Sequence, residues 1–144
     1  MGYAEIADLR LRLSELYSGV YITVDGAPMD TEAQADLDAA AAEIDSFLGS
    51  RYVVPVSAPA VLPLLKSWAV TLAEELAWSR SGKPETPKGV ADRVGNVRRM
   101  LQAIADGKQS LPGAEEKSAA EDGGGVALFA AAEPVFTRQK MKGF

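Results

Sequence analysis

Side chains that could do chemistry are few in type, because the 144 residues include no histidine and no cysteine. Histidine is the commonest general base near neutral pH and the commonest metal ligand, and cysteine supplies thiolate nucleophiles and disulfides. A Ser-His-Asp triad, a histidine-based zinc site and a thiolate site are therefore excluded. Carboxylate chemistry, a lysine nucleophile and a metal held by oxygen ligands remain possible in principle.

The carboxylates do not follow a pattern that favours catalysis or metal binding. Glu74 and Glu75 are adjacent in a strongly helical segment, but adjacent side chains on a helix project about 100° apart and do not share a proton or a metal easily. The same argument applies to Asp36 and Asp38, so we interpret these residues as a solvated helix face. The glycines at 123–125 lack the Gly-Lys-Ser/Thr of a phosphate-binding loop and indicate a linker. We expect no catalytic residues, no metal, no cofactor and no enzyme activity.

Charge is distributed unevenly along the chain. Residues 1–50 carry ten acidic and two basic side chains, a net charge of −8, whereas the rest sum to +3 within an overall charge of −5. The last seven residues, 138–144, hold three basic side chains and no acidic one. Ends of opposite sign suit head-to-tail association between copies. A solvated acidic helix face and a basic tail explain the same pattern equally well.

The sequence contains no stretch that could cross a membrane. The most apolar run, residues 58–65, includes two prolines and is followed by Lys66, and it is much shorter than the ~20 apolar residues that a membrane helix needs. We therefore expect a soluble, intracellular protein without a membrane partner.

The elements that must position these side chains are helical. Apolar residues recur at helical spacing in segments 3–16, 30–48, 60–80 and 87–105. The third segment has the widest apolar stripe and is expected to be the central helix. The sequence thus predicts an all-α fold, a bundle of about four helices with an extended C-terminal arm that contains short β-prone segments.

The connections between these helices are also readable. Residues 18–29 form a connector in which Tyr21 to Val24, followed by Asp25-Gly26, suggest a short strand and a turn. Thr31 with Gln34 three residues later predicts a capping box at the start of the second helix. Gly49 is expected to end that helix, and the prolines of residues 53–59 predict an extended linker.

Composition changes after Leu111 and divides the chain into three parts. We predict a helical body at residues 1–111, a flexible acidic, glycine-rich linker at 112–125 and an extended interaction arm at 126–144. The arm is expected to bind a partner through its large apolar and basic side chains: Val126, Leu128, Phe129, Val135, Phe136, Arg138, Lys140, Met141, Lys142 and Phe144.

A partner is expected for energetic reasons. Burying the seven large apolar side chains of the arm yields roughly 10–20 kcal/mol, whereas ordering its nineteen residues costs roughly 20–35 kcal/mol. Side-chain burial alone does not order the arm. Backbone hydrogen bonds to a neighbouring sheet, or many arms held in one ring, could close the difference.

One motif joins the end of the second helix to the loop that follows. Its members are Ile44, Asp45, Leu48, Arg51, Tyr52 and Pro55. Ile44 and Leu48 are one turn apart and are expected to face the core, while Tyr52 covers the open helix end and Pro55 keeps the exit extended. Asp45 and Arg51 are close enough in sequence to form a local ion pair. All of these roles are structural.

This motif combines with residues near both ends of the chain: Tyr3, Asp8, Leu9, Arg138, Met141, Lys142 and Gly143. In the order of its elements, nearly the whole chain resembles the head-to-tail adaptor proteins of Mu-like phages and prophages, which are related to the connector and head-completion proteins of long-tailed phages. The acidic glycine-rich linker at 112–125 departs from the family pattern and leaves the landing site of the arm open.

The resemblance implies a structural virion protein, a subunit of an oligomeric ring that docks on the portal protein and connects the DNA-filled head to the tail. It implies about twelve copies and a tail-side connector or tail terminator protein as the other neighbour. DNA would pass through the lumen without sequence-specific binding, which an acidic first half of the chain would suit. The protein would be made in the host cytoplasm and would reside in the virion neck, at the head–tail junction.

A second reading comes from another class, a small cytoplasmic DNA-binding or regulatory helical protein. It would use the basic residues of the fourth segment, Lys88, Arg93, Arg98 and Arg99. The chain is acidic overall and shows no helix-turn-helix pattern, so a salt-bridged surface is the interpretation that we favour for these residues.

Overall fold

The computed structural model describes residues 2–117. The chain divides into two compact units, Met1–Ala114 and Glu115–Phe144. The predicted linker falls largely, and the predicted arm at 126–144 wholly, outside the described residues. Residues 2–114 are called the body below.

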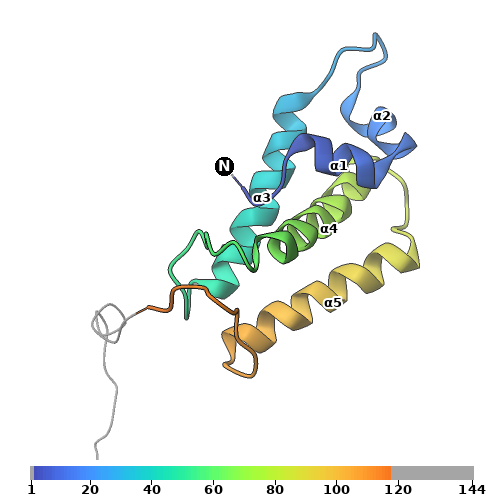
Figure 1. Ribbon diagram of the computed structural model, residues 1–144. Coiled ribbons are helices and arrows are strands. Elements are labelled where there is room, and N and C mark those ends of the chain that lie inside the picture. The colour runs from blue at the N-terminus through green and yellow to red at the C-terminus, as the bar shows by residue number, and fades with distance from the viewer. Residues whose placement is uncertain (1, 118–144) are drawn as a thin grey trace, which may run out of the picture. The chain divides into compact units, whose positions relative to one another are not determined.

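The described part of the chain is all-α, as the sequence predicted, and Figure 1 shows how its helices lie around α4. The helices in chain order are α1 (Ile6–Leu13), α2 (Glu15–Tyr21), α3 (Asp30–Leu48), α4 (Leu62–Arg80) and α5 (Lys88–Ala105). Their number is five within residues 2–117, one more than the about four expected.

The extra helix results from a break where a single N-terminal helix was expected. Ser14 ends α1 and begins α2 with φ of 56° and ψ of −122°. No glycine or proline marks this break in the sequence. The chain then stays helical to Tyr21, inside the segment that we had assigned to a connector, because Tyr17 and Tyr21 both lie in the core.

The short strand expected at residues 21–24 is reduced to one bridge. Ile22 pairs with Pro28 in an isolated antiparallel bridge, closed by a turn in which Gly26 has φ of +86°. No longer β-ladder occurs within residues 2–117. Helix α2 ends at Tyr21, so too few residues remain before the turn for a strand.

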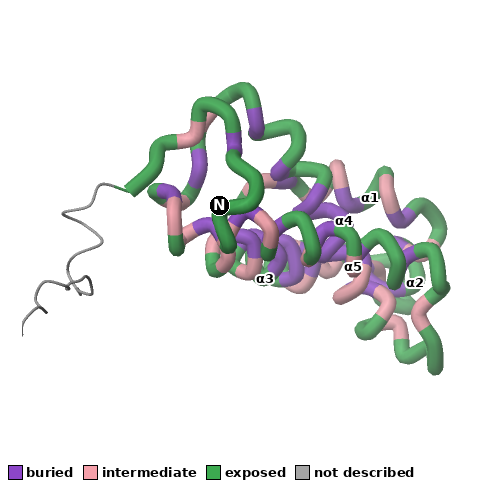
Figure 2. The backbone as a smooth tube through the Cα atoms, turned by 90° about the horizontal axis from the view of Figure 1, so that it is seen from below, coloured by how far each residue is buried: buried purple, intermediate pink, exposed green. Residues whose placement is uncertain are grey.

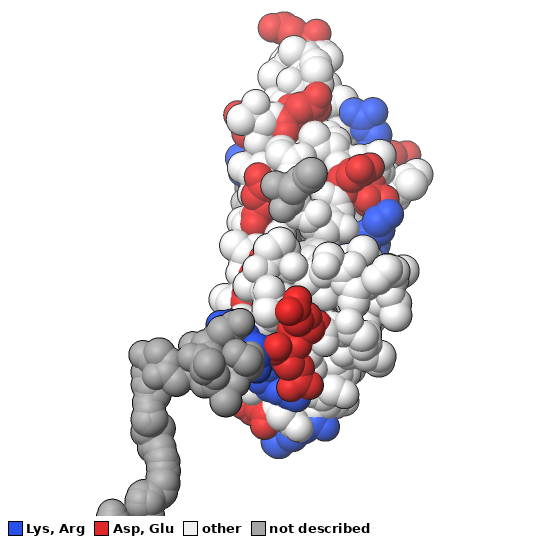
Figure 3. Space-filling view, turned by 60° about the vertical axis from the view of Figure 1, so that its left-hand side comes forward, with Lys and Arg blue, Asp and Glu red and all other residues white. Residues whose placement is uncertain are grey.

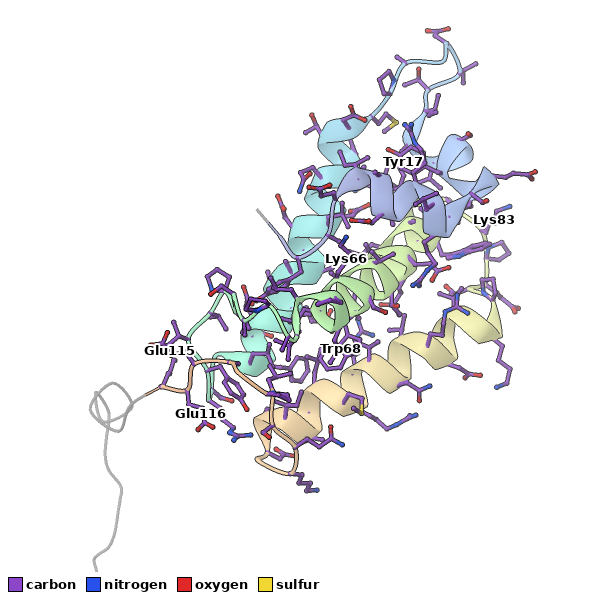
Figure 4. All side chains as sticks on the ribbon, viewed as in Figure 1. Tyr17, Lys66, Trp68, Lys83, Glu115 and Glu116 are labelled. Atoms are coloured by element: carbon purple, nitrogen blue, oxygen red, sulfur yellow. The ribbon has the colours of Figure 1, made fainter. Side chains whose placement is uncertain are left out.

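Helix α4 is the central element of the body, as its apolar stripe predicted. It packs against α1, α2, α3 and α5, and residues 68–74 are all buried. Figure 2 shows this burial along the middle of the body. Trp68 lies on the side of α4 that faces α5 (Figure 4). Pro63 lies near the start of the helix, where a missing backbone N–H costs little.

Helix α3 ends where the sequence predicted, but its start lacks the predicted cap. The predicted capping box is absent, since Met29 is the N-cap and no side chain caps the helix. Gly49 does end α3, with its N–H bonded to the carbonyl of Asp45. Its φ is −63°, so the glycine is not needed for a left-handed turn. A Cβ at this position would lie 2.9 Å from the Asp45 carbonyl oxygen, and this close approach explains the glycine.

Two non-helical segments lie together beside the ends of α3 and α5. The loop after α3 runs from residue 49 to 61 and contains a cis peptide bond between Val54 and Pro55. The chain after α5 turns at Gly107, which has φ of +84°, and brings Leu111 into the core. A Cβ on Gly113 would lie 3.8 Å from that of Ala58. The end of the body therefore packs against the loop that follows α3.

Candidate interaction surface

Three residues of the predicted motif lie in the core. Ile44, Leu48 and Tyr52 are each 0% exposed. The Tyr52 N–H donates to the carbonyl of Leu48 at 2.8 Å, and its hydroxyl accepts a hydrogen bond from the N–H of Leu111 at 2.9 Å. Tyr52 thus ties the end of α3 to the segment that follows α5.

Asp45 and Arg51, the two charged residues of the motif, each bond to groups outside the motif. Asp45 accepts a hydrogen bond from the hydroxyl of Tyr3. Arg51 donates from Nη1 to the carbonyl oxygens of Ile104 and Gln109, both at 2.8 Å. Its guanidinium therefore adds a donor to a carbonyl in the last turn of α5 and joins the loop after α3 to the end of that helix.

Pro55, the last residue of the motif, contributes to a groove on the surface of the body. The groove has a volume of about 640 Å³ and is formed by the N-terminal residues, α3, the loop after α3 and the start of α4. We call it the proline groove. Its lining residues are Gly2, Tyr3, Ala41, Asp45, Pro55, Val56, Ser57, Pro59, Leu62, Pro63 and Lys66.

Tyr3, Asp45 and Lys66, three polar residues that line the proline groove, already bond to protein atoms. The Tyr3 hydroxyl donates to Asp45 and accepts from the N–H of Val56 at 3.0 Å. Burial, and then the hydrogen bond to Asp45, raise the pKa of Tyr3 above its ordinary value, so the hydroxyl stays protonated at neutral pH. Lys66 lies 3.5 Å from the carboxylate of Asp8 on α1, and Figure 4 shows it on the side of α4 away from Trp68.

Three exposed leucines lie on α1 and at the start of α4, and one of them, Leu62, lines the groove. Leu11 on α1 is 82% exposed, and Leu62 and Leu64 at the start of α4 are 37% and 43% exposed. Leu11 and Pro63 both line a shallower hollow between α1 and α4. Figure 3 shows a broad uncharged area of surface beside clusters of acidic side chains on one face. Exposed apolar side chains such as these leucines commonly mark a site of protein–protein contact when they cluster.

The carboxylate expected to be solvated at Glu74 is instead buried, and that expectation was wrong. Glu74 is 6% exposed, and its carboxylate accepts hydrogen bonds from Arg93 Nη2 at 3.1 Å and from Arg12 Nη1 at 3.3 Å. Arg12 also donates to the hydroxyl of Thr71 at 3.1 Å. The three charged side chains link α1, α4 and α5, and the arginines compensate the charge that burial would otherwise penalise.

Asp36 is a second buried carboxylate that we had interpreted as solvated. It is 7% exposed and accepts two hydrogen bonds from Arg80, Nε at 2.9 Å and Nη2 at 2.8 Å. The Tyr21 hydroxyl donates to the same carboxylate. Burial, and then this hydrogen bond, raise the pKa of Tyr21. Asp36 therefore links α2, α3 and α4.

A third cluster of charges joins α3, α4 and α5 through Arg98. Its Nε lies 2.7 Å from Glu43, and its Nη2 lies 2.9 Å from Glu75. The hydrogen bond to Glu43, and then that to Glu75, raise the pKa of Arg98 further above its ordinary value. Glu74 and Glu75 thus point to different partners, as expected for adjacent residues on a helix.

These contacts bear on the alternative reading of α5 as a DNA-binding helix. Lys88 pairs with Asp92 at 2.9 Å, Arg93 with Glu74, and Arg98 with two glutamates. Arg99 bonds to Asn96. Three of these four cations are thus neutralised by carboxylates of their own chain and are poorly placed to replace the counterions of a phosphate backbone.

Residues 2–117 show no sign of a metal site or of a membrane-spanning helix. No cluster of three or more acidic side chains in this range could hold a metal ion. None of the helices described is long and apolar enough to span a membrane. The proline groove itself was not foreseen from the sequence, although the spacing of Pro55, Pro59 and Pro63 was a signal for an irregular surface at the entry to α4.

The fold and this surface define an all-α protein with an apolar groove on one face of its body. A family model described as Bacteriophage Mu, Gp36 matches residues 3–129. The chain belongs to this family and is a Mu-like phage protein. One relative is "Gene product J" of Escherichia phage Mu, which is 32% identical over 149 residues that cover 100% of this chain and 99% of the relative.

Proposed function

We propose that the protein is a subunit of a head-to-tail adaptor ring, a structural part of the virion that docks on the portal and connects the head to the tail. The proposal is supported by membership of a phage Mu family and, above all, by the surface of the body. A groove of about 640 Å³ with apolar walls and neighbouring exposed leucines suit contact with other protein chains.

The ring would bring together several neighbours. Copies of this chain would contact each other, the portal protein on the head side, and a tail-side connector or tail terminator protein on the other. About twelve copies follow from the resemblance to adaptor proteins. DNA would pass through the lumen in the virion neck, and the overall net charge of −5 would keep its phosphates from binding tightly.

A structural role is also consistent with how the body uses its charged residues. The body has two buried carboxylates: Asp36 is bound by Arg80, and Glu74 is bound by Arg12 and Arg93. A general acid or base needs a carboxyl group within reach of substrate and of a proton acceptor. Carboxylates that hold helices together cannot supply this, and we propose no catalytic step and no cofactor.

The test is a phage or prophage from which this gene is deleted, with the protein supplied from a plasmid. We expect the deletion to leave DNA-filled heads and separate tails in electron micrographs, and the wild-type chain to restore joined particles. Leu64→Asp, on the exposed apolar surface, should lower the yield of joined particles by about tenfold or more, a loss of ~1.4 kcal/mol of contact energy. Ser79→Asp, also on the exposed side of α4, is the control.

Two results would count against the proposal. Normal virions in the absence of the gene would show that it does not join heads to tails. Heads that lack DNA, with tails absent or present, would place the protein earlier in assembly than the portal-docking step. Truncation at residue 125 tests the arm separately, and we expect a folded, helical protein that no longer assembles on the portal.

A further inference from the structure

The chemistry of the proline groove selects its occupant. Its walls are apolar, from Pro55, Pro59, Leu62 and Pro63. Its charged side chains are already bonded, because Asp45 accepts a hydrogen bond from Tyr3 and Lys66 pairs with Asp8. A charged metabolite would have to compete with these pairs, whereas large apolar side chains of a peptide would fill the groove and leave the pairs intact.

The chain itself carries a segment with this chemistry. Residues 126–144 contain seven large apolar side chains: Val126, Leu128, Phe129, Val135, Phe136, Met141 and Phe144. Clustered aromatic and aliphatic anchors are the side chains that fill pockets at protein interfaces. The body has a groove that could take such side chains, and residues 126–144 carry them.

Charge around the groove matches the end of that segment. Glu5 and Asp38 line an adjoining hollow that shares Gly2 with the proline groove. The one lysine of the groove, Lys66, is already paired with Asp8. Residues 138–144 carry three basic side chains and no acidic one. Exposed ion pairs between these basic side chains and Glu5 or Asp38 would add little affinity, but they would set the orientation in which two chains approach each other.

The chain length allows the occupant to come from another copy. The eleven residues 115–125 extend to at most about 36–40 Å. A body of this size has a width of about 35 Å, from a radius of gyration near 13 Å. The reach therefore spans one subunit. A ring also needs two different complementary surfaces on each subunit, and a groove on the body with an apolar, basic segment elsewhere in the chain would provide them.

We infer that residues 126–144 of one copy dock in the proline groove of a second copy. The ring geometry in this inference rests on the proposed function, but the contact between copies can be tested without it. The apolar side chains of residues 126–144 enter the groove between the loop after α3 and the start of α4. The basic end of this segment lies toward Glu5 and Asp38 of the receiving copy.

The absence of cysteine from the chain allows a direct test by cross-linking of the full-length protein. One preparation carries Ser57→Cys in the groove, and another carries Thr137→Cys in the segment. The two are mixed at about 100 µM and treated with a short bismaleimide. We expect a cross-linked dimer of the two variants to form about tenfold faster than with Ser18→Cys, exposed on α2, because docking raises the effective concentration of the two thiols.

A groove variant tests the specificity of the contact. Leu62→Asp, added to the Ser57→Cys chain, should reduce the rate to that of the Ser18→Cys control. Equal rates for Ser57→Cys and Ser18→Cys would overturn the inference. So would a chain with both Ser57→Cys and Thr137→Cys that cross-links only within itself. Circular dichroism of each variant shows that the body is folded.

The outcome separates this inference from the proposed function. Cross-linking between copies of a protein whose deletion leaves normal virions would support the contact and reject the adaptor role. Loss of head–tail joining on deletion, without cross-linking above the control, would support the adaptor role and reject the contact.

Discussion

Removing the buried carboxylate of Glu74 should destabilise the protein less than removing the two arginines that bind it. The Glu74 side chain is 7% exposed, whereas those of Arg12 and Arg93 are 30% and 50% exposed. When Glu74 is replaced by the isosteric Gln, the two arginines can be solvated by small movements. When both arginines are replaced, the carboxylate stays in the interior without a cation.

The magnitudes follow from this difference. Glu74→Gln should lower the free energy of unfolding by about 1.5–3 kcal/mol, the usual value of hydrogen bonds to charged groups. Arg12→Met with Arg93→Met should lower it by about 3–5 kcal/mol, the cost of an uncompensated buried charge. Methionine keeps most of the apolar stem of arginine, so lost packing adds little. The triple variant should be more stable than the double arginine variant, because it no longer buries a charge.

The assay is urea unfolding at neutral pH, followed by circular dichroism and, separately, by tryptophan fluorescence. The control is Lys88→Met, which removes an exposed ion pair with Asp92 and should cost less than about 0.5 kcal/mol. A triple variant less stable than the double variant would refute the reasoning. So would Glu74→Gln costing as much as the loss of both arginines.

Three further predictions concern tyrosines and the break between α1 and α2. Tyr52→Phe leaves a buried backbone N–H without its partner and should cost about 1–3 kcal/mol in urea unfolding, whereas Tyr17→Phe, whose buried hydroxyl has no partner within the described residues, should be neutral or stabilising. The pKa values of Tyr3 and Tyr21 are raised in the folded state, so each stabilises the fold fully below the unfolded pKa of about 10, and above it the free energy of unfolding falls by about 1.4 kcal/mol per pH unit for each tyrosine. Replacing either with Phe should make the free energy of unfolding fall less steeply between pH 10 and 11. An unchanged slope contradicts the argument. Ser14→Gly should raise the thermal unfolding midpoint by relieving about 0.5–1 kcal/mol of strain at φ of 56°, and Ser14→Ala should not.

The parts of the fold that the sequence predicted are those set by local periodicity. Val90, Val94, Val97, Leu101 and Ile104 recur along one face of α5 and are all buried. The stripe of α4 likewise identified the central helix. In both helices the buried residues are three or four positions apart, so the buried face can be predicted from the segment alone, without knowledge of the other elements.

The parts that the sequence did not predict depend on contacts far apart in the chain. Glu74 is buried because Arg12 is positioned 62 residues away in sequence, and nothing near Glu74 indicates this. The break at Ser14 has no glycine or proline to mark it. It arises because Tyr17 and Tyr21 turn inward, and their burial outweighs the strain of one positive φ.

The proline groove was missed for a related reason. Pro55, Pro59 and Pro63 were read one at a time, as an extended loop and a helix start. A groove forms only when that loop packs against Tyr3 and α3. Concave sites are made of elements brought together by the fold, so their walls do not follow a local spacing in the sequence.

The three charge clusters bear on how the groove would bind. Each includes a residue of α4, and together they join α4 to the other four described helices through Asp36, Glu74 and Arg98. The groove walls come from α3, α4 and segments bonded to them, so they need little ordering when a ligand enters. The ordering cost of binding then falls on the incoming peptide. A single docked segment would be weak for this reason, and its affinity would rise steeply once several copies are held side by side.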